Sequence, residues 1–365
     1  MSIRIGDWKI ELEERSRPRE IVVEVSTRCN LSCIHCFRNS SSTLRLRDMS
    51  IEVFTRIVDN AVDSGVRRIV FTGWGEPTVN PEFSKMLVYS KKRGLYTIVN
   101  TNGLKLRDYS DLLINLEIDE LYVSIDAIDL ELYERIRRLG DLSIVSREIV
   151  RINKIKASKG LIKPVIKTIF TINKLNVEQI SKLVDYAVET GIQEIYLSNY
   201  IDHPGSPDNM SCIEDPVCSS RLRKILEEIG VRSVNTPVKI WYPNISSYTF
   251  RSCPFISNKA LYIRVDGRVS PCIYMAYSWE SRIDNTKRSI REVIIGDALR
   301  ERLVDIWWKN RDLLFKLYFN YMPSCLDCNL RYWCKYTMSN ESDCWGNTPN
   351  CSFCPYHYKL SYCPL

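Results

Sequence analysis

Three cysteines within eight residues are the part of this sequence with the most definite chemistry. Cys29, Cys33 and Cys36 come directly after the apolar run of residues 21–25. Thiolates at this spacing can bind three irons of a 4Fe–4S cube and leave the fourth iron open to a small ligand. A Cys3His zinc site that includes His35 and a set of disulfide bonds are the competing interpretations. Zinc fingers prefer paired ligand spacings, so the cluster is the favoured hypothesis.

The C-x3-C-x2-C motif at the end of a first strand resembles that of the radical S-adenosylmethionine (radical SAM) enzymes. The resemblance implies that Cys29, Cys33 and Cys36 are catalytic residues that hold a 4Fe–4S cluster. Its open iron would chelate the amino and carboxylate groups of S-adenosylmethionine (SAM). One electron would then break the sulfonium S–C bond and yield a 5′-deoxyadenosyl radical. His35 stands where most of the family has an aromatic residue, and this departure leaves the ligands intact.

A second motif, Gly73-Trp74-Gly75-Glu76-Pro77, follows the next predicted strand. It resembles the Gly-Gly-Glu-Pro loop of the same family, with Trp74 inserted between the two glycines. The resemblance implies that Gly73, Gly75 and Glu76 bind SAM, with the glutamate on the methionine amino group. A plain turn is the alternative, because glycine and proline mark turns in most proteins.

Four polar residues near the ends of the third and fourth predicted strands complete the expected cofactor-binding residues. They are Asn100, Asn102, Ser124 and Asp126. The two asparagines could bond the ribose or the carboxylate of SAM, although an Asn-Gly turn explains them equally well.

Short β-branched runs alternate with longer segments of helical period from residue 20 onward. The predicted strands are 21–25, 68–71, 96–100, 120–125, 165–171 and 194–198; the predicted helices lie near 50–64, 80–93, 108–116, 128–158 and 176–190. Asn176 is expected to cap the last helix and Gly191 to end it. Six alternating strands predict an α/β fold with a parallel sheet, a partial (β/α)6 TIM-like barrel over residues 20–205. Chemistry in such a barrel lies at the carboxyl ends of the strands, where the motifs fall.

The flanking segments carry weaker signals. Residues 1–19 form a polar lead-in with one apolar anchor, Trp8. Residues 206–250 are interpreted as a bridge between domains, with a helix near 219–229 and a strand at 238–242. Cys212 and Cys218 lie in this bridge, and we expect them to be buried thiols rather than metal ligands.

Residues 251–365 resemble a SPASM extension, an auxiliary iron–sulfur domain of many radical SAM maturases. Its nine thiols are Cys253, Cys272, Cys325, Cys328, Cys334, Cys344, Cys351, Cys354 and Cys363. An Asp-Gly turn predicts a hairpin over 263–269. Two fully ligated 4Fe–4S clusters need eight thiols. The first six are expected to be ligands, with the fourth partner of each set drawn from the last three. A zinc ribbon at residues 325–334 is the alternative.

The run from Asp343 to Asn347 and the cysteines around it resemble the tungsten cofactor oxidoreductase radical SAM maturases. These proteins accompany tungsten-containing aldehyde ferredoxin oxidoreductases. The resemblance implies such an oxidoreductase as the substrate partner and a reduced ferredoxin-like protein as the electron donor.

Composition excludes several classes of protein. The chain has 365 residues, a formal net charge of +7, 45% hydrophobic and 26% charged residues, and no apolar run long enough to span a membrane. Basic residues such as Arg135, Arg137 and Arg138 are expected on solvated helix faces rather than in a nucleic-acid interface. Tight cysteine pairs without a signal peptide indicate metal binding in a cytoplasmic protein.

Two other functions compete with a tungsten-enzyme maturase. A radical SAM peptide-modifying enzyme is the first, although only about twenty residues precede the barrel, too few for a leader-binding domain. Ile273 also replaces the aspartate that the sulfatase-maturing branch has after the cysteine corresponding to Cys272. A non-catalytic iron–sulfur or zinc protein is the second, and it would need neither the barrel nor the Glu76 loop.

Overall fold

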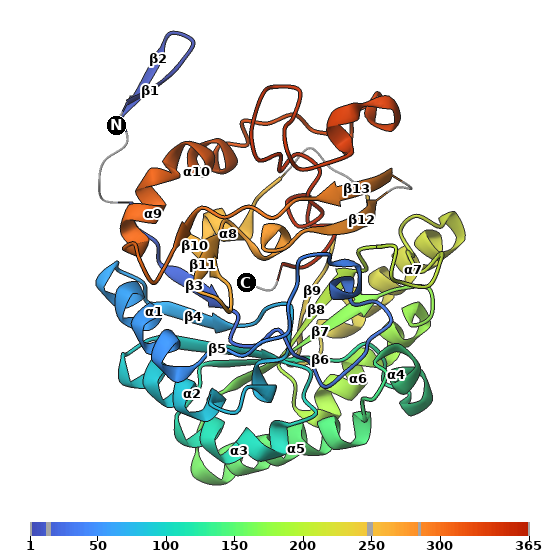
Figure 1. Cartoon of the computed structure of the whole chain (residues 1–365). Coiled ribbons are helices and arrows are strands. Elements are labelled where there is room, and N and C mark those ends of the chain that lie inside the picture. The colour runs from blue at the N-terminus through green and yellow to red at the C-terminus, as the bar shows by residue number, and fades with distance from the viewer. Residues whose placement is uncertain (1, 12–15, 247–250, 284–285, 364–365) are drawn as a thin grey trace.

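Six parallel strands in chain order form the centre of the main sheet (Figure 1). The computed structural model describes residues 2–11, 16–246, 251–283 and 286–363. The central strands are β3 (Glu20–Val23), β4 (Arg68–Phe71), β5 (Tyr96–Thr101), β6 (Glu120–Ser124), β7 (Val165–Ile172) and β8 (Glu194–Asn199). They are joined by α1 (Ile51–Asp63), α2 (Phe83–Lys92), α3 (Leu106–Asn115), α4 (Leu130–Ile136), α5 (Leu142–Lys159) and α6 (Ile180–Thr190). The predicted partial barrel is confirmed.

Local sequence signals begin and end these helices. The Ser50 side chain caps α1 by accepting from the Val53 N–H, and Asp141 caps α5 in the same way. Gly191 ends α6 with a φ of 77°, a left-handed conformation that favours glycine. Asn176 caps no helix, because its side-chain oxygen accepts from the Asn173 N–H and a 3-10 turn precedes α6.

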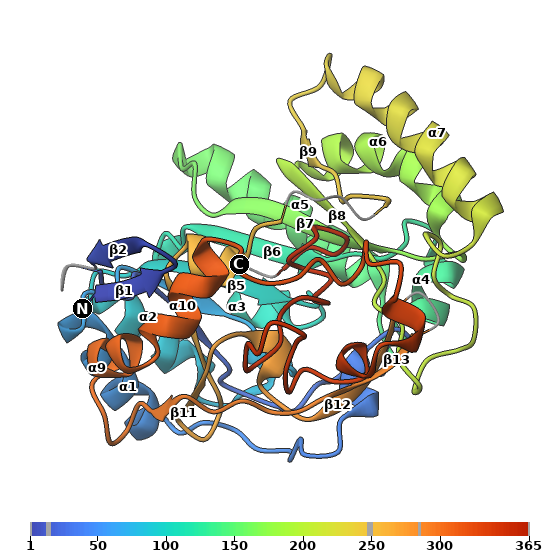
Figure 2. The same cartoon turned by 90° about the horizontal axis from the view of Figure 1, so that it is seen from above.

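The predicted bridge continues the barrel instead of leaving it. Helix α7 (Pro216–Ser233) packs against α6, and β9 (Lys239–Trp241) pairs in parallel with β8 (Figure 2). The last residues of the predicted bridge, 247–250, lie outside the described residues.

The C-terminal region extends the same sheet at its opposite edge. Strand β10 (Ala260–Ile263) pairs in parallel with β3, and β11 (Arg268–Ser270) returns beside it as the predicted hairpin, followed by β14 (Gly296–Asp297). A second hairpin consists of β12 (Trp279–Ile283) and β13 (Thr286–Ile290), and the helices are α8 (Pro254–Ser257), α9 (Leu303–Lys309) and α10 (Arg311–Tyr318). Figure 1 shows these elements on one side of the barrel and α2, α3 and α5 on the other.

Two apolar layers result from this arrangement. Ile21 and Val23 of β3 face the layer of barrel helices, whereas Val22 faces a layer shared with the C-terminal region. The second layer joins Tyr122 and Tyr196 of the barrel to C-terminal side chains such as Tyr262. The C-terminal region therefore fills the interior of the partial barrel.

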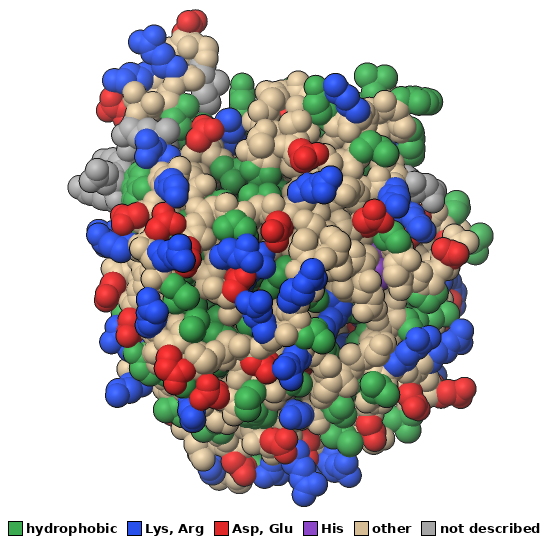
Figure 3. Space-filling view, in the orientation of Figure 1, with side chains coloured by type: hydrophobic (Ala, Val, Ile, Leu, Met, Phe, Trp, Pro, Cys, Tyr) green, Lys and Arg blue, Asp and Glu red, His purple; other side chains and the backbone are tan. Residues whose placement is uncertain are grey.

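The lead-in is a small hairpin of β1 (Ser2–Ile5) and β2 (Trp8–Glu11), which stands away from the body in Figure 1. Trp8 is 76% exposed, so the prediction that it anchors this segment is wrong. Acidic and basic side chains intermingle on the face seen in Figure 3. Within the described part of the chain, every helix is too short or too polar to cross a bilayer.

Candidate active site

A cavity of about 240 Å³ opens at the carboxyl ends of the barrel strands. Its lining includes nine of the ten residues predicted to be catalytic or to bind SAM, namely Cys29, Cys33, Cys36, Gly73, Gly75, Glu76, Asn100, Asn102 and Ser124. The sheet brings these loops together because parallel strands end at one edge. Asp126 is the exception, since it lies behind the cavity wall.

The cysteine loop is fixed by backbone contacts with the end of α4. The N–H groups of Ser32 and Ile34 donate to the carbonyl oxygens of Arg138 and Ile136, both at 3.0 Å. Burial raises the pKa of the Cys33 thiol to about 12 and also raises that of Cys36. Metal binding at these thiols must therefore release protons.

The three thiols of the cysteine loop have the chemistry that an iron–sulfur cube requires. Cys29, Cys33 and Cys36 line the same cavity. A cube takes one thiolate on each of three irons and leaves its fourth iron open. The three residues therefore fit such a cluster.

Glu76 joins the loop after β4 to the end of β5. Its Oε1 accepts from the hydroxyls of Thr78 (2.6 Å) and Thr101 (2.7 Å) and from the Thr78 N–H (3.1 Å), and its Oε2 accepts from the Asn102 N–H (2.7 Å). A carboxylate oxygen can accept about two hydrogen bonds. One acceptor position on Oε2 therefore remains for a ligand in the cavity.

Gly75 is needed for the close approach of this loop to the cysteine loop. A Cβ at Gly75 would lie 2.3 Å from the Ser26 carbonyl oxygen and 2.6 Å from that of Arg28. Asn102 supports the same loop, because its side-chain amide donates to the Asn30 side chain at 2.8 Å.

A buried ion pair replaces the solvated arginine that we expected at residue 137. Arg137 is 6% exposed, and its Nη1 donates to Oδ2 of Asp126 at 2.7 Å. His35 lies 3.3 Å from the same carboxylate oxygen, and burial lowers the pKa of its ring. Arg137 reaches the cavity wall, where its buried Nε has no hydrogen-bond partner. The helical periodicity of the sequence did not reveal this, because Arg137 follows the last residue of α4.

The C-terminal region supplies further cavity residues that sequence reasoning missed. Trp74 donates its indole N–H to the Ile273 carbonyl oxygen at 3.0 Å, so the inserted tryptophan ties the barrel to the cysteine-rich region. Ile273, Tyr356 and Tyr362 also line the cavity. The Tyr362 N–H donates to the Ser198 hydroxyl at 2.9 Å. This bond places the segment that contains Tyr362 against β8.

The nine C-terminal thiols form two groups. The inner cysteine set consists of Cys253, Cys272, Cys351, Cys354 and Cys363, whose thiols interact electrostatically and pack against the apolar layer inside the barrel. The outer cysteine set consists of Cys325, Cys328, Cys334 and Cys344, and Cys344 is exposed. Each set has at least the four thiols that one cluster needs. Cys344 lies with Cys325, Cys328 and Cys334, and the last three cysteines lie with Cys253 and Cys272.

Comparison with known proteins agrees with this geometry. A model of the radical SAM superfamily matches residues 23–187, and a model of the SPASM iron–sulfur cluster-binding domain matches residues 253–329. The tungsten-containing aldehyde ferredoxin oxidoreductase cofactor-modifying protein of Pyrococcus furiosus is 30% identical, over 94% of this chain and 97% of that protein. This chain belongs to the radical SAM family. A probable GTP 3′,8-cyclase of Sulfurisphaera tokodaii is 25% identical over 76% of this chain and 86% of that protein.

Solved structures show the same fold. SuiB of Streptococcus suis bound to S-adenosylmethionine matches with a TM-score of 0.63 at 20% identity, covering 88% of this chain and 72% of that one. Native anSMEcpe with bound AdoMet matches with a TM-score of 0.61 at 17% identity, covering 94% and 96%. The predicted family, fold class and enzymatic nature of this radical SAM protein are confirmed.

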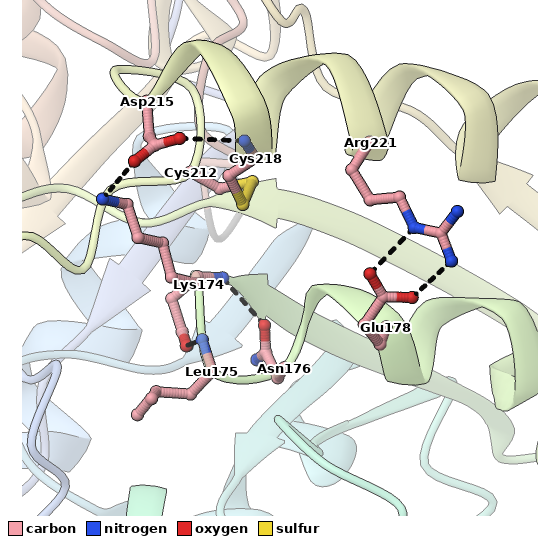
Figure 4. The surroundings of a disulfide bond; sticks show 9 residues. Lys174, Leu175, Asn176, Glu178, Cys212, Asp215, Cys218 and Arg221 are labelled. Atoms are coloured by element: carbon pink, nitrogen blue, oxygen red, sulfur yellow. Dashed lines mark hydrogen bonds and ion pairs between the residues drawn. A yellow bond between two sulfur atoms is a disulfide. The ribbon is translucent and has the colours of Figure 1, made fainter.

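Cys212 and Cys218 of this radical SAM enzyme form a disulfide, so the prediction of two unpaired thiols is wrong (Figure 4). The start of α7 explains their proximity. Asp215 caps the helix by accepting from the Cys218 N–H at 2.9 Å, and the turn before it brings Cys212 alongside. Lys174 forms an ion pair with the same Asp215 carboxylate, with Nζ 2.7 Å from Oδ2.

Proposed function

We propose that this enzyme cleaves SAM reductively and uses the resulting radical to mature a tungsten-containing aldehyde ferredoxin oxidoreductase. A reduced 4Fe–4S cluster on Cys29, Cys33 and Cys36 would supply the electron that breaks the S–C bond. The 30% identity to the cofactor-modifying protein over nearly the whole of both chains carries the proposal. The cavity that gathers the cysteine loop and Glu76 supports it.

The chain offers a partner to each charged end of the methionine moiety. Oε2 of Glu76 has an acceptor position for the ammonium group, and the unpartnered Nε of Arg137 is a donor for the carboxylate. Asn100 and Ser124 line the same wall and can bond the remaining polar groups. These contacts orient SAM and hold its charges away from water.

The remaining wall of the cavity suits abstraction of hydrogen from an unactivated carbon. Glu76 is the only carboxylate among the described lining residues, and Ile273, Tyr356 and Tyr362 supply apolar surface. Abstraction of hydrogen by a radical requires no general base at this step. The inner and outer cysteine sets would hold two auxiliary 4Fe–4S clusters that exchange electrons with a ferredoxin-like donor or the substrate radical.

The test is to produce the oxidoreductase anaerobically with this enzyme, without it, and with the Cys29→Ala/Cys33→Ala/Cys36→Ala variant. We expect full activity and the mature cofactor mass only with the wild-type enzyme. Identical oxidoreductase from all three preparations would overturn the assignment of the substrate. A mass change in a small co-produced peptide would then favour the peptide-modifying alternative.

Cleavage of SAM is tested separately on the purified enzyme after reduction with dithionite. The wild type should form 5′-deoxyadenosine, and the triple variant should form none while it retains iron in its C-terminal region. Formation of 5′-deoxyadenosine by the triple variant would show that another cluster performs the cleavage.

A further inference from the structure

Arg288 is a fully buried cation inside the cysteine-rich region. It lies on β13 and is 1% exposed, and it is one of the largest fully buried side chains in the described residues. Its Nη2 donates to the carbonyl oxygens of Ser339 (2.8 Å) and Asn350 (3.4 Å). These two bonds fix the plane of the guanidinium.

The charge of Arg288 has no carboxylate partner among the described residues. Its Nε and Nη1 atoms are buried and donate to no acceptor among the described residues. Arginine stays protonated in proteins, so Arg288 cannot avoid the cost of burying its charge by losing a proton. A buried charge without a partner strongly destabilises a fold. The fold must therefore supply negative charge that the protein atoms alone do not provide.

Both cysteine sets lie beside this guanidinium. Asn350, whose carbonyl oxygen accepts from Nη2, directly precedes Cys351 of the inner set. The Phe353 ring, next to Cys354, lies 5.2 Å from the guanidinium carbon. The Cys325 N–H of the outer set donates to the Ser352 carbonyl oxygen at 3.3 Å, so the same short segment runs between the two sets. The thiols of Cys351, Cys354 and Cys325 all interact electrostatically with Arg288.

We propose that Arg288 is the shared counter-ion of two auxiliary clusters and that its free N–H groups set their reduction potentials. The inference rests on the proposal that the inner and outer cysteine sets each hold a 4Fe–4S cluster. Four thiolates give such a cluster a net negative charge, which supplies the compensation that Arg288 lacks. Arg288 is a positioning residue, since it acts on electron transfer through the clusters and is not among the described residues that line the cavity.

The physical effect has a definite sign. Reduction adds one negative charge to a cluster, and a nearby cation stabilises the reduced form more than the oxidised form. Hydrogen bonds and net charge around the sulfur atoms are established determinants of cluster potential. Arg288 therefore raises the reduction potentials of both clusters.

The test is an EPR-monitored redox titration in the Cys29→Ala/Cys33→Ala/Cys36→Ala background, which leaves only the auxiliary signals. Arg288→Met should lower both midpoint potentials by about 59 mV or more, a tenfold change in the ratio of reduced to oxidised cluster. Arg288→Gln should do the same and can still donate to the Ser339 carbonyl oxygen, which protects the fold. Lys287→Met is the matched control, because Lys287 is exposed on the same strand and pairs with Glu280 at 3.0 Å.

Unchanged potentials in Arg288→Gln with full iron content would overturn the proposal and leave the proposed function intact. A shift of equal size in Lys287→Met would also overturn the proposal, because the loss of any nearby positive charge would then lower the potentials. Zinc in place of iron in the wild-type protein would overturn both this inference and the auxiliary clusters on which it rests.

Discussion

Glu76 stabilises two cavity loops and is also expected to bind SAM. Substitutions at this residue must separate these two roles. Four hydrogen bonds from Thr78, Thr101 and Asn102 join two cavity loops through its carboxylate. A truncation to alanine would remove all four bonds together with the charge. Glutamine keeps the shape and the acceptor oxygen that Thr78 and Thr101 use, and it removes the charge together with the one bond that Oε2 accepts from the Asn102 N–H.

We expect Glu76→Gln to weaken SAM binding by roughly 10- to 150-fold, since a hydrogen bond to a charged group contributes roughly 1.5–3 kcal/mol. Equilibrium dialysis with reconstituted enzyme under anaerobic conditions measures this affinity. Thr78→Val is the control, because it removes a neutral hydroxyl from Oε1 and leaves the charge; its effect should be several-fold smaller. Equal affinity in Glu76→Gln and the wild type would make Glu76 a turn residue only.

Arg137 needs a double variant, because its ion pair with Asp126 is buried. Arg137→Met should lower the free energy of unfolding by roughly 3–5 kcal/mol, since it leaves the Asp126 carboxylate buried and unpaired. Arg137→Met/Asp126→Asn removes both charges and should recover most of that stability. If Arg137 binds the SAM carboxylate, the double variant still binds SAM at least tenfold more weakly. Wild-type affinity in the double variant would limit Arg137 to a structural role.

At the scale of elements, the barrel strands were predictable because each is a short β-branched run between helices with caps. β4 matches its predicted range of 68–71, β3 differs by one or two residues at each end, and the other four differ by one residue at one end. The cysteine loop and the Glu76 loop were predictable for the same reason, since both follow strands whose order fixes their place. The SPASM match and the Asp-Gly hairpin also come from local sequence.

Contacts between distant segments could not be predicted in this way. The pairing of β10 with β3 joins residues about 240 positions apart, and no local pattern encodes which sheet edge accepts a strand. Arg137 looked like a surface cation because its partner, Asp126, reaches it only through the fold. The division of nine thiols between two sets depends on the path of residues 350–354, which spacing alone leaves undetermined.

The Cys212–Cys218 disulfide gives a test of one such element. It closes a short loop with a sequence separation of 6 at the start of α7. The chain-entropy model assigns about 2 kcal/mol to a loop of this size. Cys212→Ser/Cys218→Ser should therefore lower the thermal midpoint without changing iron content, measured by calorimetry and metal analysis. Loss of iron from this variant would instead make these cysteines ligands.

At the scale of the whole molecule, the barrel and the C-terminal region share one apolar layer. Tyr362 lies 4.5 Å from Tyr196 between ring centroids, and the Leu360 carbonyl oxygen accepts from the Asn199 side chain at 2.7 Å. All five residues of the inner cysteine set belong to or pack against that layer. The inner set is therefore part of the folded core, whereas the outer set contributes only Cys325 to a separate small apolar cluster.

This difference predicts how iron is distributed over the chain. Three cubes require about twelve irons after anaerobic reconstitution, and loss of one cube should leave about eight. We expect about eight irons both in Cys29→Ala/Cys33→Ala/Cys36→Ala and in Cys325→Ala/Cys328→Ala/Cys334→Ala, because neither set supplies the shared apolar layer. Cys351→Ala/Cys354→Ala should lose stability as well as iron, since both residues pack against that layer. Metal analysis with circular dichroism checks each variant. About four irons in the wild type, with zinc making up the difference, would show that the C-terminal thiols form a structural zinc domain instead of electron carriers.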